Sequence, residues 1–222
     1  MGDVTALPMF GVDLDKTQSV APVDVLRRHL DGRFSIDPFG ADPQLQDLIA
    51  PVFLRVVPVR AEGMHHIPPT GPALLVSNRG LGVLEPTALT VAVRKVCGRR
   101  LRIVGTPEIP IVGDALRKLG SVGNYPADLG ALLRAGHLAA LPLGVNWLRT
   151  GVGLAPTDML VTALGYPVIP VLVRPGGPFG LPLLPWKVTF GAPIVVGTIG
   201  DRDPLSAAEL AEAAREAVHA LA

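Results

Sequence analysis

The sequence predicts a single α/β domain with a mainly parallel, mixed central sheet flanked by helices on both faces. Strand-sized apolar runs alternate with stretches of helical periodicity along most of the chain. That alternation is typical of parallel sheets covered on both faces. A length of 222 residues is enough to bury one substantial core, and one domain is the default expectation for this length.

The first forty residues are interpreted as a lead-in to the domain. A short helix is expected over Pro22–Leu30, and residues 37–40 (DPFG) predict a turn. The α/β domain itself is placed at residues 41–222. It begins with an amphipathic helix over Pro43–Leu54 that runs into a strand at Arg55–Val59.

Strands and helices then alternate to the end of the chain. The run Ala73–Ser77 is apolar nearly throughout and is followed by Asn78, as expected of a buried strand. Further strands are expected at Leu101–Val104, His137–Leu141, Val168–Val173 and Lys187–Phe190. Helices are expected at Pro86–Val96, Val112–Leu119, Ala127–Ala135, Pro156–Leu164 and after Asp203-Pro204, where the aspartate is an N-cap signal.

Composition and charge limit the partners and the compartment. Hydrophobic residues make up 49% and the mean hydropathy is +0.42, so the chain is well buried or touches something apolar. A formal charge of +1 gives no general attraction to nucleic acid, and no nucleic-acid partner is expected. Cys97 is the single cysteine, which fits a reducing compartment. With no secretory signal and no apolar run of about 18 residues, we expect a cytoplasmic protein whose membrane contact, if any, is peripheral on the inner face.

Several segments between residues 37 and 196 resemble one enzyme family in their order and spacing. Residues 63–68 (GMHHIP) and 71–78 (GPALLVSN) are similar to the stretch that leads into the catalytic motif of bacterial phospholipid/glycerol acyltransferases of the lysophosphatidic acid acyltransferase type. Later segments resemble further blocks of that family: 119–122, 132–137, 167–171 and 186–194. The resemblance implies a glycerolipid acyltransferase-like fold and acyl transfer to a hydroxyl acceptor of the lysophospholipid class.

The resemblance breaks at the catalytic motif, Asn-His-x-x-x-x-Asp in that family. Arg79 replaces the histidine, Leu84 stands at the spacing of the aspartate, and Glu85 follows one position later. The family's histidine takes the proton of the acceptor hydroxyl, whereas a guanidinium stays protonated and cannot act as that base. The Pro-Glu-Gly block that helps bind the acceptor reads Pro142-Leu143-Gly144, so its glutamate is missing as well.

None of the five histidines is a good substitute for the missing base. In a parallel sheet the site lies at the carboxyl ends of the strands. His65, His66 and His137 precede or begin strands and are expected at the opposite end, and His29 and His219 are expected on peripheral helices.

The candidate catalytic residues are therefore Arg79 and Glu85. Arg79 could bind an anion or stabilise an oxyanion, or it could pair with Glu85 and fill the cleft. Glu85 could be an unusual base, or it could cap the helix that begins at Pro86, where a carboxylate is favoured. The sequence leaves these alternatives open.

Residues around the same strand ends are the substrate-binding candidates. They comprise the residue after the first buried strand, a small glycine turn, and polar or altered-block residues in later loops: Asn78, Gly80, Gly82, Asn124, Tyr125, Pro142, Gly144, Asn146 and Arg149. Separately, a basic cluster near a helix end either attracts anionic groups or is a solvated basic loop: Arg94, Lys95, Arg99, Arg100 and Arg102.

Three functions stay open on the sequence. The first is acyl transfer from acyl-CoA or an acyl carrier protein by an altered mechanism. The second is a catalytically dead pseudoenzyme that binds a lipid or acyl thioester, and the third is a repurposed enzyme acting on a specialised metabolite. No bound cofactor and no metal are expected, and the oligomeric state is left open.

Overall fold

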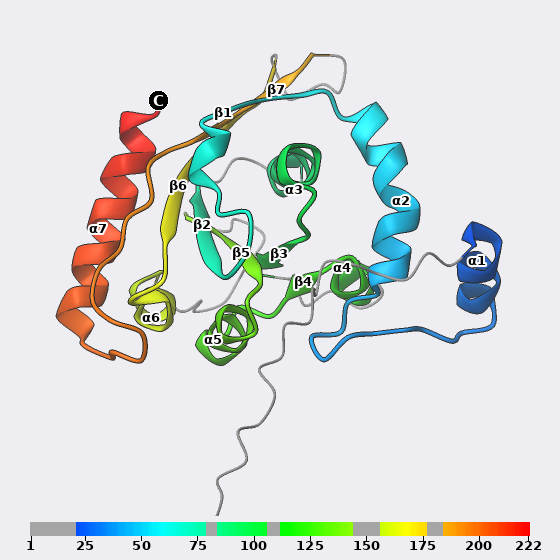
Figure 1. The fold of residues 1–222 in the computed structure, drawn as a ribbon, viewed down its shortest axis with the longest axis horizontal. Helices are drawn as coiled ribbons and strands as arrows, with labels where there is room; N and C mark the ends of the chain where they lie inside the picture. Colours follow the sequence, from blue (N-terminus) through cyan, green and yellow to red (C-terminus); the bar gives the residue numbers. More distant parts are fainter. Residues whose placement is uncertain (1–20, 79–83, 106–111, 144–155, 177–183) are drawn as a thin grey trace, which may run out of the picture.

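A mostly parallel sheet forms the centre of the computed structural model, which describes residues 21–78, 84–105, 112–143, 156–176 and 184–222 (Figure 1). Within these residues the strand order is β1-β7-β6-β2-β5-β3-β4. The strands are β1 (Val59–Glu62), β2 (Ala73–Ser77), β3 (Leu101–Val104), β4 (Ser121–Val122), β5 (Leu138–Pro142), β6 (Val168–Arg174) and β7 (Trp186–Phe190). Every neighbouring pair is parallel except β6 and β7, so the predicted mixed sheet is confirmed.

Helices cover both faces of this sheet, as the alternation predicted (Figure 1). One core lies between the sheet and α3, with residues of α2 at its margin, and the other lies beneath α5, α6 and α7. The helices are α1 (Pro22–Leu30), α2 (Pro43–Val56), α3 (Leu84–Cys97), α4 (Val112–Lys118), α5 (Pro126–Arg134), α6 (Pro156–Leu160) and α7 (Pro204–Ala220). Short 3-10 helices occur at Met64–His66 and Val161–Ala163.

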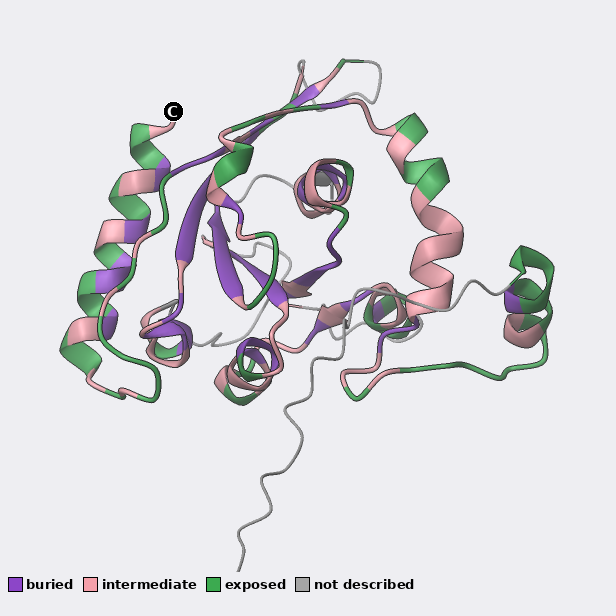
Figure 2. Cartoon of the chain, in the orientation of Figure 1, coloured by how far each residue is buried: buried purple, intermediate pink, exposed green. Residues whose placement is uncertain are grey.

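The central strand β2 is buried along its whole length, which explains its apolar sequence (Figure 2). It pairs in parallel with β5 on one side and β6 on the other. Leu74 and Val76 point into the core beneath α5 to α7, whereas Ala73 and Leu75 point into the core beneath α3. A strand with a core on each face needs apolar residues at every position.

Two aspartates begin helices, and each accepts backbone hydrogen bonds from the first turn. The fully buried Asp42 caps α2 by accepting from the backbone N–H groups of Gln44 and Leu45. Asp203 caps α7, and the hydroxyl and backbone N–H of Ser206 are the main reason that the pKa of its carboxyl is lowered. The predicted N-cap at Asp203 is confirmed.

The predicted strand at Arg55–Val59 is wrong. Helix α2 continues to Val56, and β1 begins only at Val59. Pro58 explains where the change occurs, because the residue before a proline avoids helical backbone angles and Val57 is extended, with φ −102° and ψ 96°. The partly buried Leu54 packs against the core beneath α3, so burial keeps this turn helical.

Two shorter elements also differ from the sequence prediction. The two-residue strand β4 was missed, because Ser121–Val122 is too short to show a periodicity; its pairing with β3 defines it. The helix predicted over Pro156–Leu164 is divided into α6 and the 3-10 turn at Val161–Ala163.

Candidate functional site

The candidate site lies at the carboxyl ends of the parallel strands β2, β5 and β6. Ser77, the last residue of β2, is in register with Pro142 at the end of β5 and with Val171 in β6. The backbone N–H of Leu143 donates to the carbonyl of Ser77 over 2.7 Å, which holds the two chain segments together as they leave the sheet. Crevices at this edge are where open α/β sheets bind ligands.

Asn78 ties the end of β2 to β6. Its Nδ2 donates to the carbonyl of Val173 at 2.9 Å, and its Oδ1 accepts from the N–H of Val173 at 2.6 Å. Both polar groups of the amide are therefore engaged with backbone. The side chain thus pairs with β6 as a backbone amide would and fixes the residue that follows β2. Val173 as the partner of Asn78 was not anticipated, because 95 residues separate the two.

Glu85 brings a carboxylate to this edge from the first turn of α3. The residue is half-buried, and its Oε2 atom is buried with no hydrogen-bond partner in the part of the chain that the structure describes. Leaving a buried polar atom unpaired is costly, so such an atom calls for an explanation. Its place at a helix N-terminus is favourable for a negative charge.

The remaining site predictions divide between described and undescribed residues. Asn124 and Tyr125 follow β4 at the same edge, and Tyr125 is exposed at the start of α5. Pro142 ends β5 beside Ser77. The other predicted site residues lie outside the described residues: Arg79, Gly80, Gly82, Gly144, Asn146 and Arg149. The same holds for the side chain of Leu84.

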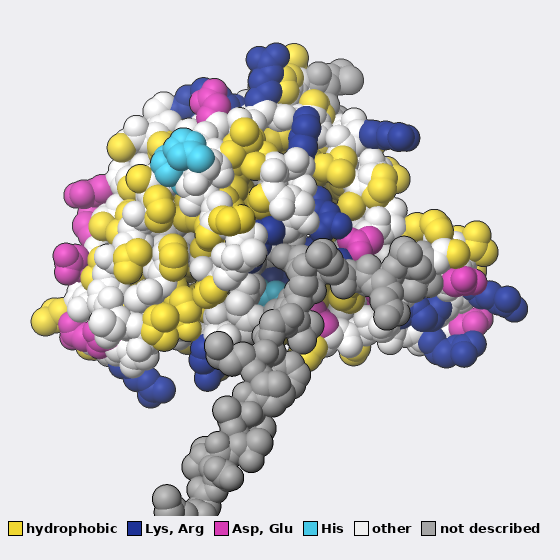
Figure 3. Space-filling view, viewed as in Figure 1, with side chains coloured by type: hydrophobic (Ala, Val, Ile, Leu, Met, Phe, Trp, Pro, Cys, Tyr) yellow, Lys and Arg dark blue, Asp and Glu magenta, His cyan; other side chains and the backbone are white. Residues whose placement is uncertain are grey.

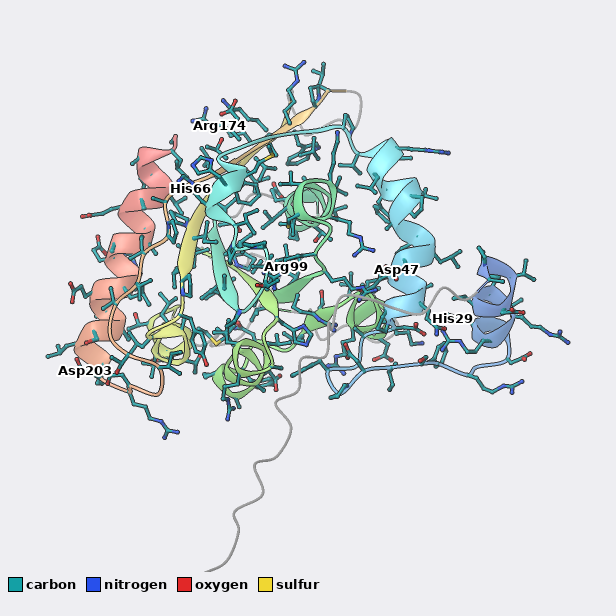
Figure 4. The ribbon with its side chains drawn as sticks, in the orientation of Figure 1. His29, Asp47, His66, Arg99, Arg174 and Asp203 are labelled. Carbon is teal, nitrogen blue, oxygen red and sulfur yellow. The ribbon has the colours of Figure 1, made fainter. Side chains whose placement is uncertain are left out.

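His65, His66 and His137 lie where the sequence placed them, at the opposite end of the sheet from the carboxyl ends of β2, β5 and β6. His66 contacts the carbonyl of Phe190 through Nδ1 at 3.0 Å (Figure 4), and its ring lies 4.0 Å from that of His65. His137 precedes β5 and packs edge-on against Phe39. His29 lies on α1. Among the described residues no group of three or more His, Cys, Asp or Glu side chains could hold a metal ion.

The arginines of the basic cluster form neither a solvated loop nor a surface for anions. Arg99, Arg100 and Arg102, called the buried arginines below, are all less than a tenth exposed. Arg99 donates to the carbonyls of Pro68, Gly71 and Gly136, which precede β2 and β5. The loops at the amino ends of the strands are thus joined by one guanidinium.

The other two buried arginines pair with carboxylates from segments that precede the sheet in the chain. Arg100 binds Asp47 of α2 at 2.7 Å, and Arg94 of α3 binds the same carboxylate at 2.5 Å. Arg102 pairs with Asp37 in the lead-in. Both sequence interpretations of this cluster missed its role, because partners 28 to 65 residues away decide it.

No helix among the described residues is long and apolar enough to cross a membrane.

Comparison with known proteins identifies relatives in sequence and in structure, although no family model matches the chain. The chain is 31% identical to the uncharacterized protein ML2427 of Mycobacterium leprae, with 90% of this chain and 71% of the relative covered. It is 30% identical to the uncharacterized protein Rv0502 of Mycobacterium tuberculosis, with 92% of this chain and 73% of the relative covered.

A structural likeness extends over most of the chain. The crystal structure of the 1-acyl-sn-glycerophosphate (LPA) acyltransferase PlsC from Thermotoga maritima matches with a TM-score of 0.50 and 16% sequence identity. The match covers 79% of this chain and 81% of that chain. The fold is therefore acyltransferase-like, as the sequence predicted.

Proposed function

The chain belongs to the family of these uncharacterized mycobacterial proteins, and from its acyltransferase-like fold we propose that it transfers an acyl group to a hydroxyl acceptor by an altered mechanism. The proposed donor is acyl-CoA or an acyl carrier protein, and the proposed acceptor belongs to the lysophospholipid class. The protein would act in the cytoplasm, with peripheral contact on the inner face of the membrane.

The observation that carries this proposal is the unpaired carboxylate oxygen of Glu85. It lies in the first turn of the helix that follows β2, one position beyond the place of the family's aspartate. A carboxylate oxygen that lacks a donor is free to accept a proton or a hydrogen bond from a substrate hydroxyl. The N-cap carboxylate of Asp42, by contrast, accepts hydrogen bonds from the backbone N–H groups of Gln44 and Leu45.

In the proposed step Glu85 takes the proton of the acceptor hydroxyl as its oxygen attacks the thioester carbonyl. The carbon–oxygen bond forms, the carbon–sulfur bond of the tetrahedral intermediate breaks, and the thiolate leaves and takes the proton from Glu85. Arg79 is proposed to stabilise the oxyanion of the intermediate as a fixed positive charge. Asn78 supports both, because its two hydrogen bonds to Val173 hold the residue that precedes Arg79 in the chain.

Carboxylates are weaker bases than histidine near neutral pH, so the altered site should be slow. An acid–base group is normally worth about 10²–10⁴-fold in rate, and positioning of the two substrates would account for much of what remains. The assay is release of free CoA from a panel of acyl-CoAs with lysophosphatidic acid. Enzyme concentrations must be high enough to reveal a roughly 10⁴-fold impaired enzyme.

Three variants make that assay specific. Glu85→Gln keeps the shape and removes the base, Arg79→Ala removes the proposed oxyanion partner, and Glu209→Gln on the exposed side of α7 is the matched control. Loss of turnover in the first two variants, with the control unchanged, is expected. Turnover that survives Glu85→Gln overturns the assignment of the base.

The catalytically dead alternative is favoured by one observation, the joint replacement of the family's histidine and aspartate by Arg79 and Leu84. It predicts no CoA release above the protein-free blank. It also predicts saturable binding of an acyl thioester or lysophospholipid, measured by calorimetry with the same preparation. Binding without turnover would replace acyl transfer with a binding function for this site.

A further inference from the structure

Three basic side chains lie next to one another on the neighbouring strands β1, β7 and β6. Arg60 of β1 is in register with Lys187 of β7, and Lys187 is in register with Arg174 of β6. Register partners on neighbouring strands point to the same face of a sheet, so the three side chains form a row on one face. We call Arg60, Lys187 and Arg174 the basic strip.

The face that carries the strip is the outer one. The alternate residues of the same strands, among them Val59, Val173, Trp186 and Val188, belong to the core beneath α3. Because side chains alternate between the two faces, the strip points away from that core. All three of its side chains are exposed.

Helix α7 does not extend over the strip. The helix ends at Ala220. The side chain of the next residue, Leu221, lies 3.4 Å from the position that a Cβ atom of Gly191 would occupy. Gly191 follows the last residue of β7, whereas Lys187 lies near the first. Figure 3 shows Lys and Arg side chains with an acidic one over the β1–β7 end of the sheet. Figure 4 places Arg174 in the same region, beyond the end of α7.

The strip is not explained by the stability of the sheet. Like charges directly opposite one another on neighbouring strands are destabilising. Glu62 offsets part of the charge through its 2.9 Å ion pair with Lys187, but Arg60 and Arg174 have no ion-pair partner among the described residues. A row of three cations and one anion thus keeps a net positive charge.

The strip also lies toward the carboxyl ends of β2 and β6, where the candidate site is. Val171 of β6 is in register with Ser77, so Arg174, three residues later, extends past the end of β2. Leu184, which is 48% exposed, lies just before β7 and adds an apolar side chain beside the strip. Cations next to an exposed apolar residue are typical of surfaces that bind a membrane interface.

We infer that the basic strip is a docking surface for the anionic headgroups of a lipid bilayer. The three side chains spread across a sheet face instead of converging on one point, which suits a plane of negative charge. Docking there would bring the strand ends toward the lipid. The inference deepens the proposed function, on which it rests for its lipid substrate, but binding requires no turnover and the two can fail separately.

The test is co-sedimentation of the full chain with vesicles of phosphatidylcholine alone or of equimolar phosphatidylcholine and phosphatidylglycerol. The strip variant is Arg60→Gln/Lys187→Gln/Arg174→Gln. The control variant, Arg27→Gln/Lys95→Gln/Arg202→Gln, removes the same charge at exposed positions off the strip. Thermal unfolding of both variants checks that each is folded.

Binding is expected to the anionic vesicles only and to weaken as salt is raised. Affinity of the strip variant should fall roughly tenfold to a hundredfold at low salt, while the control variant loses much less. Equal losses in the two variants would show a general charge effect and overturn the inference. So would release of the protein by glycerol phosphate but not by sulfate at matched ionic strength, because the strip would then be a site for a soluble phosphate.

Discussion

The buried arginines and the basic strip use the same kind of side chain for opposite purposes. Each buried arginine is less than a tenth exposed, and carbonyls or carboxylates from distant segments accept its hydrogen bonds. In the strip only Lys187 has an ion-pair partner among the described residues, Glu62, and all three cations are exposed. Burial makes a guanidinium depend on its partners, because an unpaired buried charge is very costly.

This difference shows that a cluster of basic residues in a sequence has no single meaning. The arginines of the cluster that stands out in the sequence, residues 94–102, are engaged in internal contacts that join α2, the lead-in and the loops before the strands. The strip, scattered over more than a hundred positions, is the one whose charge is left for an external anion.

Replacing Arg99 should have the largest effect on stability. Arg99→Met keeps the apolar stem but leaves the carbonyls of Pro68, Gly71 and Gly136 without their donor. The free energy of unfolding should fall by about 3 kcal/mol in urea denaturation. The control is Arg134→Met, whose exposed guanidinium bonds only within its own helix. Equal small effects of both changes would remove the contrast drawn above.

Replacing Asp47 should cost somewhat less. Asp47→Ala removes the shared partner of Arg94 and Arg100, and only the Arg100 side chain is deeply buried, at 7% exposure. The expected loss is about 2 kcal/mol in the same measurement. Pairing the change with Arg100→Met should recover part of this loss, because the buried guanidinium that lost Asp47 is then removed as well. A fully additive double variant would contradict the coupling.

Replacing the strip should barely change stability. Arg174→Gln removes a like charge opposite Lys187, so the free energy of unfolding should stay the same or rise by about 0.5 kcal/mol. Thermal unfolding at low salt measures this, since screening weakens the repulsion at high salt. A clear loss of stability would mean that Arg174 has a structural partner and is not held for an outside anion.

The effect of removing the N-cap of α7 should depend on pH. The pKa of Asp203 is lowered in the folded state by its hydrogen bonds to Ser206. The carboxylate therefore stabilises the fold at pH values above 3.8, the ordinary pKa of an aspartate. This contribution is lost as the pH falls through the folded value. Asp203→Ala should therefore destabilise near neutral pH and differ less from the parent chain below pH 3.8. A difference that does not depend on pH would contradict an ionic cap.

Much of the fold could be predicted because its signals are local. The apolar run 73–77 and the aspartate at 203 act on their immediate neighbours. Where the prediction failed, at the start of β1, burial of Leu54 competed with a strand-like pattern. Glu85 was a site candidate from the resemblance to the acyltransferase motif, but only the structure shows its Oε2 unpaired among the described residues.

The sequence by itself determined the α/β class, the order of most strands and helices, and the absence of the histidine and aspartate of the acyltransferase motif that it resembles. Each of these follows from periodicity over a few residues or from identity at one position. The tertiary structure decided which side chains meet: Asn78 with Val173, Arg99 with three distant carbonyls, and the three cations of the strip. Strand register and burial bring together residues far apart in the chain, and no local pattern encodes them.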